Sequence, residues 1–306
     1  MKVGYIGLGN MGAPIVLRLL AAHEVAVYDT RAAVVAQLTA NGAVGCGSVA
    51  EVASRSEMVM LCLPSSKHVR SVLFGAGGVV SAAAAGTVVI DQTTGDPGET
   101  RIMASELRAA GLDLVDAPVS GGPVAAQRGD IAIMVGADGS AFDTVAPVLG
   151  TISSRIFHPG GTGAGHMVKL VNNLVSVVQS AGSLEAMALV AKNGVDPLRA
   201  LEILLQTSAG NHYLSKFVAA QILTGDLDSG FTVGVLHKDG KLACHLGSES
   251  GVPMLFGAAA RDIYQVAVNM LGADADGSAL ALAIDRLAGT HLVPAARVAP
   301  PAGPAA

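Results

Sequence analysis

The sequence of 306 residues predicts an α/β domain followed by an all-helical domain. Through residue 160 or so, short runs rich in β-branched residues alternate with helix-like segments, as in βαβ units around a parallel sheet. After Gly165 the strand-like runs end, and apolar residues recur at helical spacing up to residue 288. The length agrees with two domains, because a chain of this size is too long for one ordinary core.

Seven runs are candidate strands of the first domain. Several lack the apolar–polar alternation of a half-exposed strand, so we expect both of their faces to be covered. The runs are residues 2–7, 24–29, 58–63, 87–91, 112–117 and 130–136, with 154–158 as a further candidate at the end.

The second part is predicted to begin with one long helix, residues 164–193. At 1.5 Å per residue this helix is about 45 Å long, which suits a link between two domains, and Gly194 is a natural stop. The Pro/Ala-rich residues 293–306 have little apolar surface to bury, so we expect a disordered tail there. The predicted domains are therefore residues 1–163 and 164–292.

The composition limits the kinds of molecule that the protein is expected to bind. The chain is 51% hydrophobic and 14% charged, and its net charge of −5 comes without any block of Lys or Arg. A nucleic-acid or anionic-membrane binder needs such a block. We therefore expect a small soluble ligand, with no nucleic acid and no membrane as partner.

Cysteine usage and the N-terminus favour a cytoplasmic protein. Cys46, Cys62 and Cys244 form no C-x-x-C pair, so neither a disulfide framework nor a metal site is expected. No signal-peptide pattern is readable at the N-terminus. The longest apolar runs, such as residues 79–90, are shorter than a membrane-spanning helix.

The motif GLGNMG follows the first candidate strand and opens a helix-like segment. Gly7 allows the tight turn, Gly9 lets the backbone approach a pyrophosphate, and Gly12 lets the helix pack on the strand. Asp29 ends the second strand, where an acidic residue binds ribose hydroxyls. These features predict an N-terminal Rossmann dinucleotide-binding domain, whose cofactor would also contact Leu8, Asn10, Met11 and Thr30.

The charge of Asp29 favours NAD as the cofactor. A carboxylate accepts hydrogen bonds from the ribose hydroxyls and repels a 2′-phosphate. Arg31 lies two residues further on, where a guanidinium could pair with that phosphate. NADP therefore stays open as an alternative.

A second glycine turn follows the strand at 112–117. In DAPVSGGPVAA (116–126), the Ser120 hydroxyl and the amides of Gly121 and Gly122 could cradle a substrate carboxylate. Taken alone, the same turn could be a simple connection between a strand and a helix.

The ordered set of motifs resembles the β-hydroxyacid dehydrogenase family, which includes 3-hydroxyisobutyrate dehydrogenases and tartronate semialdehyde reductases. The resemblance spans residues 1 to about 290. It implies a Rossmann domain, a long inter-domain helix, an all-α second domain and homodimers or homotetramers. It also implies nicotinamide-dependent conversion between a short hydroxyacid and its carbonyl form. The motifs are GLGNMG, LP at 63–64, DQTTGDP at 91–97, DAPVSGG, GGTGAGHMVKLVNN at 160–173 and HKDGKLA at 237–243.

The resemblance implies that Lys169 is the catalytic general acid/base and that Asn173 binds substrate. Residues i and i+4 share a helix face, so both side chains can point into one cleft. Neutral Lys169 would accept the hydroxyl proton in oxidation, and its ammonium form would protonate the alkoxide in reduction. The alternative for Lys169 is a solvated lysine on an amphipathic helix.

Other positions match the family's motifs less specifically. Ser120, Gly121 and Gly122 resemble its carboxylate-binding residues, while Thr94 matches a threonine near the nicotinamide that contacts cofactor or substrate. Phe231 could line the cleft or belong to the core. Asn211 lies in a polar stretch that suggests an additional hydroxyl or acidic group on the substrate, or a helix cap. The remaining cofactor matches are Leu63, Pro64, Lys238 and His68, the last of which could equally be a surface histidine.

Three other classes are weighed against this interpretation. An imine reductase shares the two-domain plan but generally lacks the lysine. A 6-phosphogluconate dehydrogenase-like enzyme would need a longer second domain and basic residues for phosphate. A non-catalytic dinucleotide-binding module would not need Lys169. TTG at 93–95, where the family more often has STI, and Gly240 in place of leucine weaken any assignment to one substrate subfamily.

Overall fold

The computed structural model describes residues 1–294, which divide into two compact units, residues 1–170 and residues from 171 onward. The division falls inside a helix rather than at the expected boundary of 163 and 164. The first unit contains a nine-stranded sheet. In the described part of the second unit every regular element is a helix, so the α/β and all-helical parts are confirmed.

The sheet of the first unit is parallel over most of its width. The strand order is β3-β2-β1-β4-β5-β6-β8-β7, with β9 beside β8, and its first six positions follow the 3-2-1-4-5-6 order of a Rossmann fold. The strands are β1 (Lys2–Ile6), β2 (Glu24–Tyr28), β3 (Val44–Gly45), β4 (Met58–Leu61), β5 (Val88–Asp91), β6 (Asp113–Asp116), β7 (Val119–Ser120), β8 (Ala132–Gly136) and β9 (Ile156–Gly160).

Sequence reasoning missed two strands and one change of direction. β3 and β7 have two residues each, which is too short for any periodic signal. β8 runs antiparallel to both β6 and β7, so the sheet is not wholly parallel as predicted. The seven expected strands are present, each within a few residues of its expected range.

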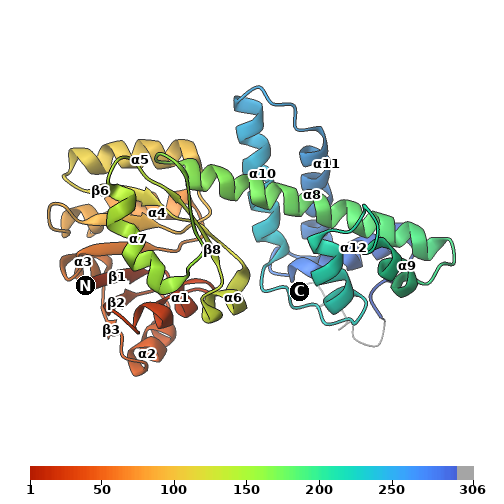
Figure 1. The fold of residues 1–306 in the computed structure, drawn as a ribbon, viewed down its shortest axis with the longest axis horizontal. Helices are drawn as coiled ribbons and strands as arrows, with labels where there is room; N and C mark the ends of the chain where they lie inside the picture. The colour runs from red at the N-terminus through yellow and green to blue at the C-terminus, as the bar shows by residue number, and fades with distance from the viewer. Residues whose placement is uncertain (295–306) are drawn as a thin grey trace, which may run out of the picture. The chain divides into compact units, whose positions relative to one another are not determined.

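Alternate side chains of the strands fill two cores, one on each face of the sheet. Tyr5 and Met60 belong to the core under α1 and α7, and Ile6 and Leu61 to the core under α4 and α5 (Figure 1). The helices of this unit are α1 (Gly12–Leu19), α2 (Ala32–Ala40), α3 (Val49–Ser54), α4 (Ser66–Phe74), the 3-10 turn η1 (Val79–Ser81), α5 (Pro97–Ala109), α6 (Gly122–Arg128) and α7 (Ala141–Ile152).

The register of the parallel strands brings four strand ends together. Ile6 pairs with Leu61, Leu61 with Asp91, and Asp91 with Asp116. The carboxyl ends of β1, β4, β5 and β6 therefore form one edge of the sheet, where ligands of doubly wound α/β folds bind.

The long predicted helix is α8 (Ala164–Lys192). It begins in the first unit and ends in the second, where Val177, Leu184 and Met187 pack in the core. The other elements of the second unit are α9 (Pro197–Leu204), the π-helical η2 (Leu214–Ile222), α10 (Val233–Glu249), α11 (Leu255–Leu271), the 3-10 turn η3 (Gly277–Ala279) and α12 (Leu280–Ala288).

Among the described residues, α8 is the helix long and apolar enough to cross a membrane by length and composition. The sequence analysis did not single it out, because its polar residues interrupt the apolar runs. Part of its apolar surface packs in the core of the second unit through Val177, Leu184 and Met187, while Val175 and Leu189 are exposed.

The predicted tail begins too early at residue 293. Val293 is buried, and its amide donates a hydrogen bond to Asp285 Oδ2 at 3.1 Å, so this residue belongs to the folded unit. The rest of the predicted tail, from residue 295, lies outside the described residues.

Candidate active site

The glycine motif occupies the turn between β1 and α1. Gly7 has φ +97°, and a Cβ on it would collide with the carbonyl oxygen of Cys62. A Cβ on Gly12 would meet the carbonyl oxygen of Gly7, so this glycine permits the close packing of helix on strand. Gly9 differs from both, because no described heavy atom lies within 4 Å of where its Cβ would be. Gly7 and Gly12 therefore serve the fold, and Gly9 leaves space open beside the backbone.

The start of α1 fits a pyrophosphate. No side chain caps this helix, so its first amides have no side-chain acceptor, and helix N-termini attract anions. Asn10 is exposed and Met11 half-buried at the turn, while Leu8 is buried beneath it. The residues present thus fit a dinucleotide, and Gly9 is where its phosphates can approach.

Asp29 and Arg31 form a compact charged pair at the end of β2. Asp29 Oδ2 accepts the Leu8 amide at 2.7 Å, and Asp29 Oδ1 accepts the Nε of Arg31 at 3.0 Å. Burial acts to raise the pKa of Asp29, but the hydrogen bonds from Arg31 and Leu8 outweigh it and hold this pKa below its ordinary value. Asp29 is therefore a charged acceptor at neutral pH, and Thr30 beside it is exposed.

The segments after β4 and β5 are joined by side-chain hydrogen bonds, one of which runs from the Asp96 amide to Ser66 Oγ at 2.8 Å. The Leu63 amide donates to Thr93 Oγ1 at 3.1 Å, so Thr93, which sequence reasoning passed over, links the two segments. Thr94 is half-buried and Pro64 exposed. His68 is exposed in α4, and its Nδ1 lies 2.8 Å from Ser65 Oγ.

The second glycine turn needs glycine at two successive positions. Gly121 has φ +138° and Gly122 has φ +79°, values that side chains disfavour. Ser120 ends β7 and is half-buried, while Gly121 is exposed. Backbone freedom therefore explains both glycines, and an exposed amide with a neighbouring hydroxyl is available to an anion.

Lys169 lies on the second turn of α8 and is buried, with 9% of its surface exposed. Its neighbours in the chain differ in burial, since Leu170 is buried and Val168 is 41% exposed. The apolar sequence around Lys169 therefore explains its burial only in part. The solvated lysine considered as the alternative does not describe this side chain. A lysine that is buried in the first turns of a helix anchored to the end of β6 is suited to proton transfer.

Asp116, at the end of β6, anchors the start of α8. Its carboxylate accepts the amide of Gly163 at 2.6 Å and that of His166 at 2.7 Å. A Cβ on Gly165 would collide with the Met134 carbonyl oxygen, and Gly163 has φ +92°. The glycines of GTGAGHMVK are therefore required where the helix begins against the sheet. Burial raises the pKa of Asp116, although His166 and these amides act to lower it.

In the second unit, Asn173 is part of a polar chain with α10. Its Nδ2 donates to Asp239 Oδ2 at 2.6 Å, and its Oδ1 accepts from Asn172 at 2.9 Å. Lys238 Nζ forms an ion pair with Asp239 Oδ1 at 3.1 Å. The buried Asp239 thus contacts both Asn173 and Lys238, which are the residues of this unit that the motifs predict as site residues.

Asn211 and the backbone of Phe231 form hydrogen bonds within the second unit. Asn211 Oδ1 accepts the amide of Leu214, and its Nδ2 donates to Ser183 Oγ, each at 3.0–3.3 Å. These bonds correspond to the helix-capping alternative. Phe231 is half-buried, and its carbonyl oxygen accepts the Gly277 amide at 2.7 Å.

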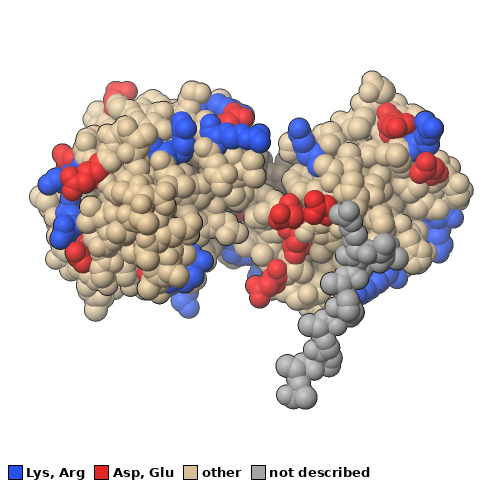
Figure 2. All heavy atoms as spheres, turned by 90° about the horizontal axis from the view of Figure 1, so that it is seen from below, with Lys and Arg blue, Asp and Glu red and all other residues tan. Residues whose placement is uncertain are grey.

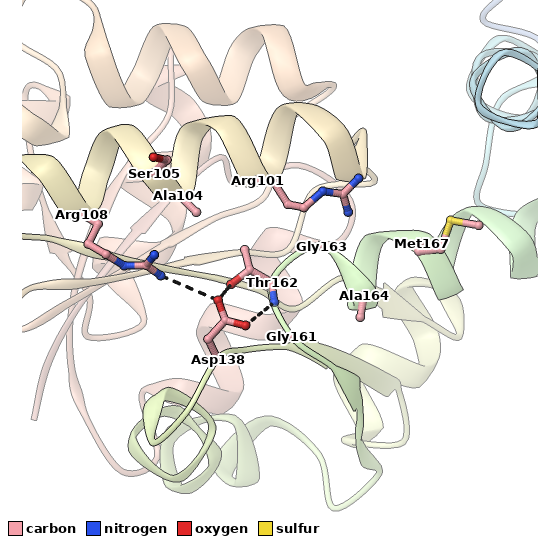
Figure 3. Close-up of a pocket in the computed structure, with 10 residues that line it drawn as sticks. All are labelled: Arg101, Ala104, Ser105, Arg108, Asp138, Gly161, Thr162, Gly163, Ala164 and Met167. Atoms are coloured by element: carbon pink, nitrogen blue, oxygen red, sulfur yellow. Dashed lines mark hydrogen bonds and ion pairs between the residues drawn. The ribbon is translucent and has the colours of Figure 1, made fainter. Parts of the chain in front are cut away.

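A hollow of about 540 Å³ lies between α5 and the segment entering α8 (Figure 3). Asp138 at its floor accepts the amide and hydroxyl of Thr162 at 3.1 and 2.8 Å and lies 3.7 Å from Arg108. None of the described residues that line it was predicted as a site residue. The hydrogen bonds of Asp138 thus hold Thr162, which lies just before α8.

Lys and Arg side chains form no large block on the face that Figure 2 shows. On the face shown in Figure 2, the described Lys and Arg side chains stand singly or in small groups among uncharged ones. Among the described residues, no group of three or more His, Cys, Asp or Glu side chains could hold a metal ion.

Together, the sheet order, the glycine turn and the acidic strand end define a dinucleotide-binding domain of the Rossmann type. Residues 2–160 match the family model for the NAD binding domain of 6-phosphogluconate dehydrogenase, and residues 163–284 match that for the NAD-binding of NADP-dependent 3-hydroxyisobutyrate dehydrogenase. The chain belongs to the β-hydroxyacid dehydrogenase family, as its motifs predicted.

Relatives and solved structures agree with this membership. A 2-(hydroxymethyl)glutarate dehydrogenase of Eubacterium barkeri is 40% identical over 87% of this chain and 88% of its own length. A 3-hydroxyisobutyrate dehydrogenase of Pseudomonas aeruginosa is 35% identical over 86% and 91%. The structure of a Mycobacterium tuberculosis 3-hydroxyisobutyrate dehydrogenase with L-serine superposes with a TM-score of 0.84 at 29% identity, covering 92% of this chain and 98% of that one.

Imine reductases share the fold alone. The Streptomyces aurantiacus enzyme has a TM-score of 0.63 at 24% identity, over 92% of this chain and 99% of its own. The family models and the relatives above show that the chain is an NAD(P)-dependent dehydrogenase that acts on hydroxyacids.

Proposed function

We propose that the chain interconverts a 2-alkyl-substituted 3-hydroxypropanoate and its semialdehyde with NAD(H), and that Lys169 carries the proton. The observation that supports this most is the burial of Lys169 on a helix whose first turn is held by Asp116. Water would compete for the proton of an exposed amine, whereas a buried and positioned amine exchanges it with one bound group.

The proposed roles follow from the chemistry of each group. A bound nicotinamide dinucleotide supplies the hydride acceptor or donor. In oxidation, neutral Lys169 Nζ accepts the hydroxyl proton as the carbon–hydrogen bond breaks and the carbonyl forms. In reduction, the ammonium returns that proton to the alkoxide oxygen. Ser120 with the amides of Gly121 and Gly122 binds the substrate carboxylate, and Asn173 contributes an amide held by Asp239.

The substrate class is inferred from what two relatives' names share. Both 2-(hydroxymethyl)glutarate and 3-hydroxyisobutyrate carry a hydroxymethyl group on the carbon next to a carboxylate. We expect a purified sample to reduce NAD⁺ with at least one of these two compounds faster than with L-serine or L-threonate. Tartronate semialdehyde and sulfolactaldehyde, the aldehydes of two other relatives, are assayed for comparison by following the oxidation of NADH. Turnover of a cyclic imine but of none of these compounds would favour the imine reductase alternative.

Cofactor choice follows from the Asp29–Arg31 pair. The ionised Asp29 engages Arg31 and would repel a 2′-phosphate, so we propose NAD over NADP. Asp29→Asn should lower the ratio of kcat/KM for NAD to that for NADP about tenfold, the effect of roughly 1.5 kcal/mol of charged hydrogen bonding. The double variant Asp29→Asn/Arg31→Ala is the control, because without the guanidinium NADP should gain little. Wild-type activity confined to NADP(H) would overturn the assignment.

We also propose that the protein works in the cytoplasm as a homodimer or homotetramer. Its buried thiols, Cys46 and Cys244, suit a reducing compartment. Sedimentation of the purified chain measures the oligomeric state.

A further inference from the structure

Two buried carboxylates and a buried imidazole meet where α8 begins. Asp91 ends β5, Asp116 ends β6, and His166 lies in the first turn of α8; each is 0% exposed. His166 Nε2 lies 3.9 Å from Asp91 Oδ2, and its Nδ1 lies 4.0 Å from Asp116 Oδ2. Burying two carboxylates costs free energy unless other groups compensate for it. The presence of this cluster therefore needs an explanation.

Thr100 fixes the orientation of the His166 ring. Its Oγ1 lies 2.8 Å from Nδ1 and also donates to the Asp96 carbonyl oxygen at 2.8 Å. A hydroxyl has one hydrogen, and Thr100 uses it for the bond to Asp96. Thr100 Oγ1 therefore accepts a hydrogen bond from His166 Nδ1, which carries the proton. The ring is therefore held by α5 through Nδ1, while Nε2 lies 3.9 Å from Asp91 Oδ2.

Gly95 closes the space around the same ring. A Cβ at this position would lie 2.9 Å from His166 Cε1 and 3.1 Å from Nδ1. A larger residue would have to displace the imidazole, because the ring is already bonded to Thr100. The ring thus has little room to shift.

The backbone of His166 is held by a hydrogen bond as well. Its amide donates to Asp116 Oδ2 at 2.7 Å, next to the bond from Gly163. His166 and Lys169 are three residues apart and lie on the same side of α8. A tilt of the first turn would therefore move the lysine amine directly.

We propose that His166 is a positioning residue for Lys169. Its ring, held by Thr100 and flanked by Asp91 and Asp116, fixes the first turn of α8 and with it the position of Nζ. This inference rests on the proposed catalytic role of Lys169. A misplacement of about 1 Å at a reacting group can lower the rate about 10²-fold.

The test compares His166→Leu, His166→Gln and the wild type. His166→Leu should lower kcat about 10²-fold and leave the Kd for NADH nearly unchanged. Glutamine can still donate a hydrogen bond to Thr100, so His166→Gln should recover much of the lost kcat. His158→Leu is the matched control, because His158 is a histidine of the same unit that is exposed and bonded to the Ala137 carbonyl oxygen. A folded His166→Leu protein with wild-type kcat would overturn the proposal.

Thr100→Val and Gly95→Ala decide the question if His166→Leu does not fold. The first removes the bond to Nδ1 at nearly constant volume, and the second pushes on the ring. Lower kcat in both at an unchanged Kd for NADH supports the proposal, and wild-type kcat in both contradicts it.

A double variant separates this inference from the proposed function. In a Lys169→Ala background, His166→Leu should cause no further loss of kcat, because it acts through the missing amine. A further loss would show that His166 acts by another route and would overturn the positioning role alone. Full activity of Lys169→Ala itself would instead overturn the proposed function.

Discussion

Lys169→Ala is expected to lower kcat between about 10²- and 10⁴-fold, the usual contribution of a positioned general acid/base. The Kd for NADH should change little, because the fingerprint that binds the dinucleotide lies in the β1–α1 turn. Stopped-flow measurement of NADH formation with the best substrate gives the rate, and fluorescence titration gives the Kd.

A second lysine of α8 provides the matched control. Lys192 is exposed, and its Nζ donates to the Ala288 carbonyl oxygen at 2.9 Å. Lys192→Ala removes the same side chain from the same helix and should leave kcat unchanged. If the two variants had equal kcat, the catalytic role of Lys169 would have to be abandoned.

Two alanine substitutions in the glycine motif should have opposite effects on folding and binding. Gly9→Ala places a methyl group in open space, so the melting temperature without cofactor should stay the same. Its effect should fall on the approach of the pyrophosphate, raising the Kd for NAD about 10- to 100-fold, as expected for one charged hydrogen bond of roughly 1.5–3 kcal/mol.

Gly12→Ala should instead destabilise the fold. Its methyl group would meet the Gly7 carbonyl oxygen and the Tyr5 ring, and overpacking of this kind costs about 1–3 kcal/mol. Calorimetry of both variants without cofactor separates the two cases. A large loss of stability in Gly9→Ala would mean that this glycine serves folding rather than cofactor binding.

The sequence predicted the fold well because its strongest signals are local. The strand runs, the glycine turn and the apolar periodicity of α8 each follow from residues close together in the chain. β3 and β7 are held by pairing with β2 and β8, which no two-residue pattern reveals. The antiparallel direction of β8 likewise depends on long-range pairing.

The site was predictable only in part. Lys169 and the glycines were found because their motifs are contiguous. Asp116 and His166 are 50 residues apart and are joined only by the fold. The two aspartates that end VVID and DLVD were the available signal, since adjacent strand ends meet at one edge of a parallel sheet. For Asn211 the sequence left a substrate contact and a helix cap open, and its hydrogen bond with the Leu214 amide corresponds to the cap.

The pH dependence of kcat/KM for alcohol oxidation tests the central claim most directly. A base must lose its proton before it can accept one, so the wild-type rate should rise with pH through a single group and then level off. Lys169→Ala should lack this rise, and added methylamine should restore part of the rate. The same rise in the Lys169→Ala enzyme, with no response to the amine, would contradict the account.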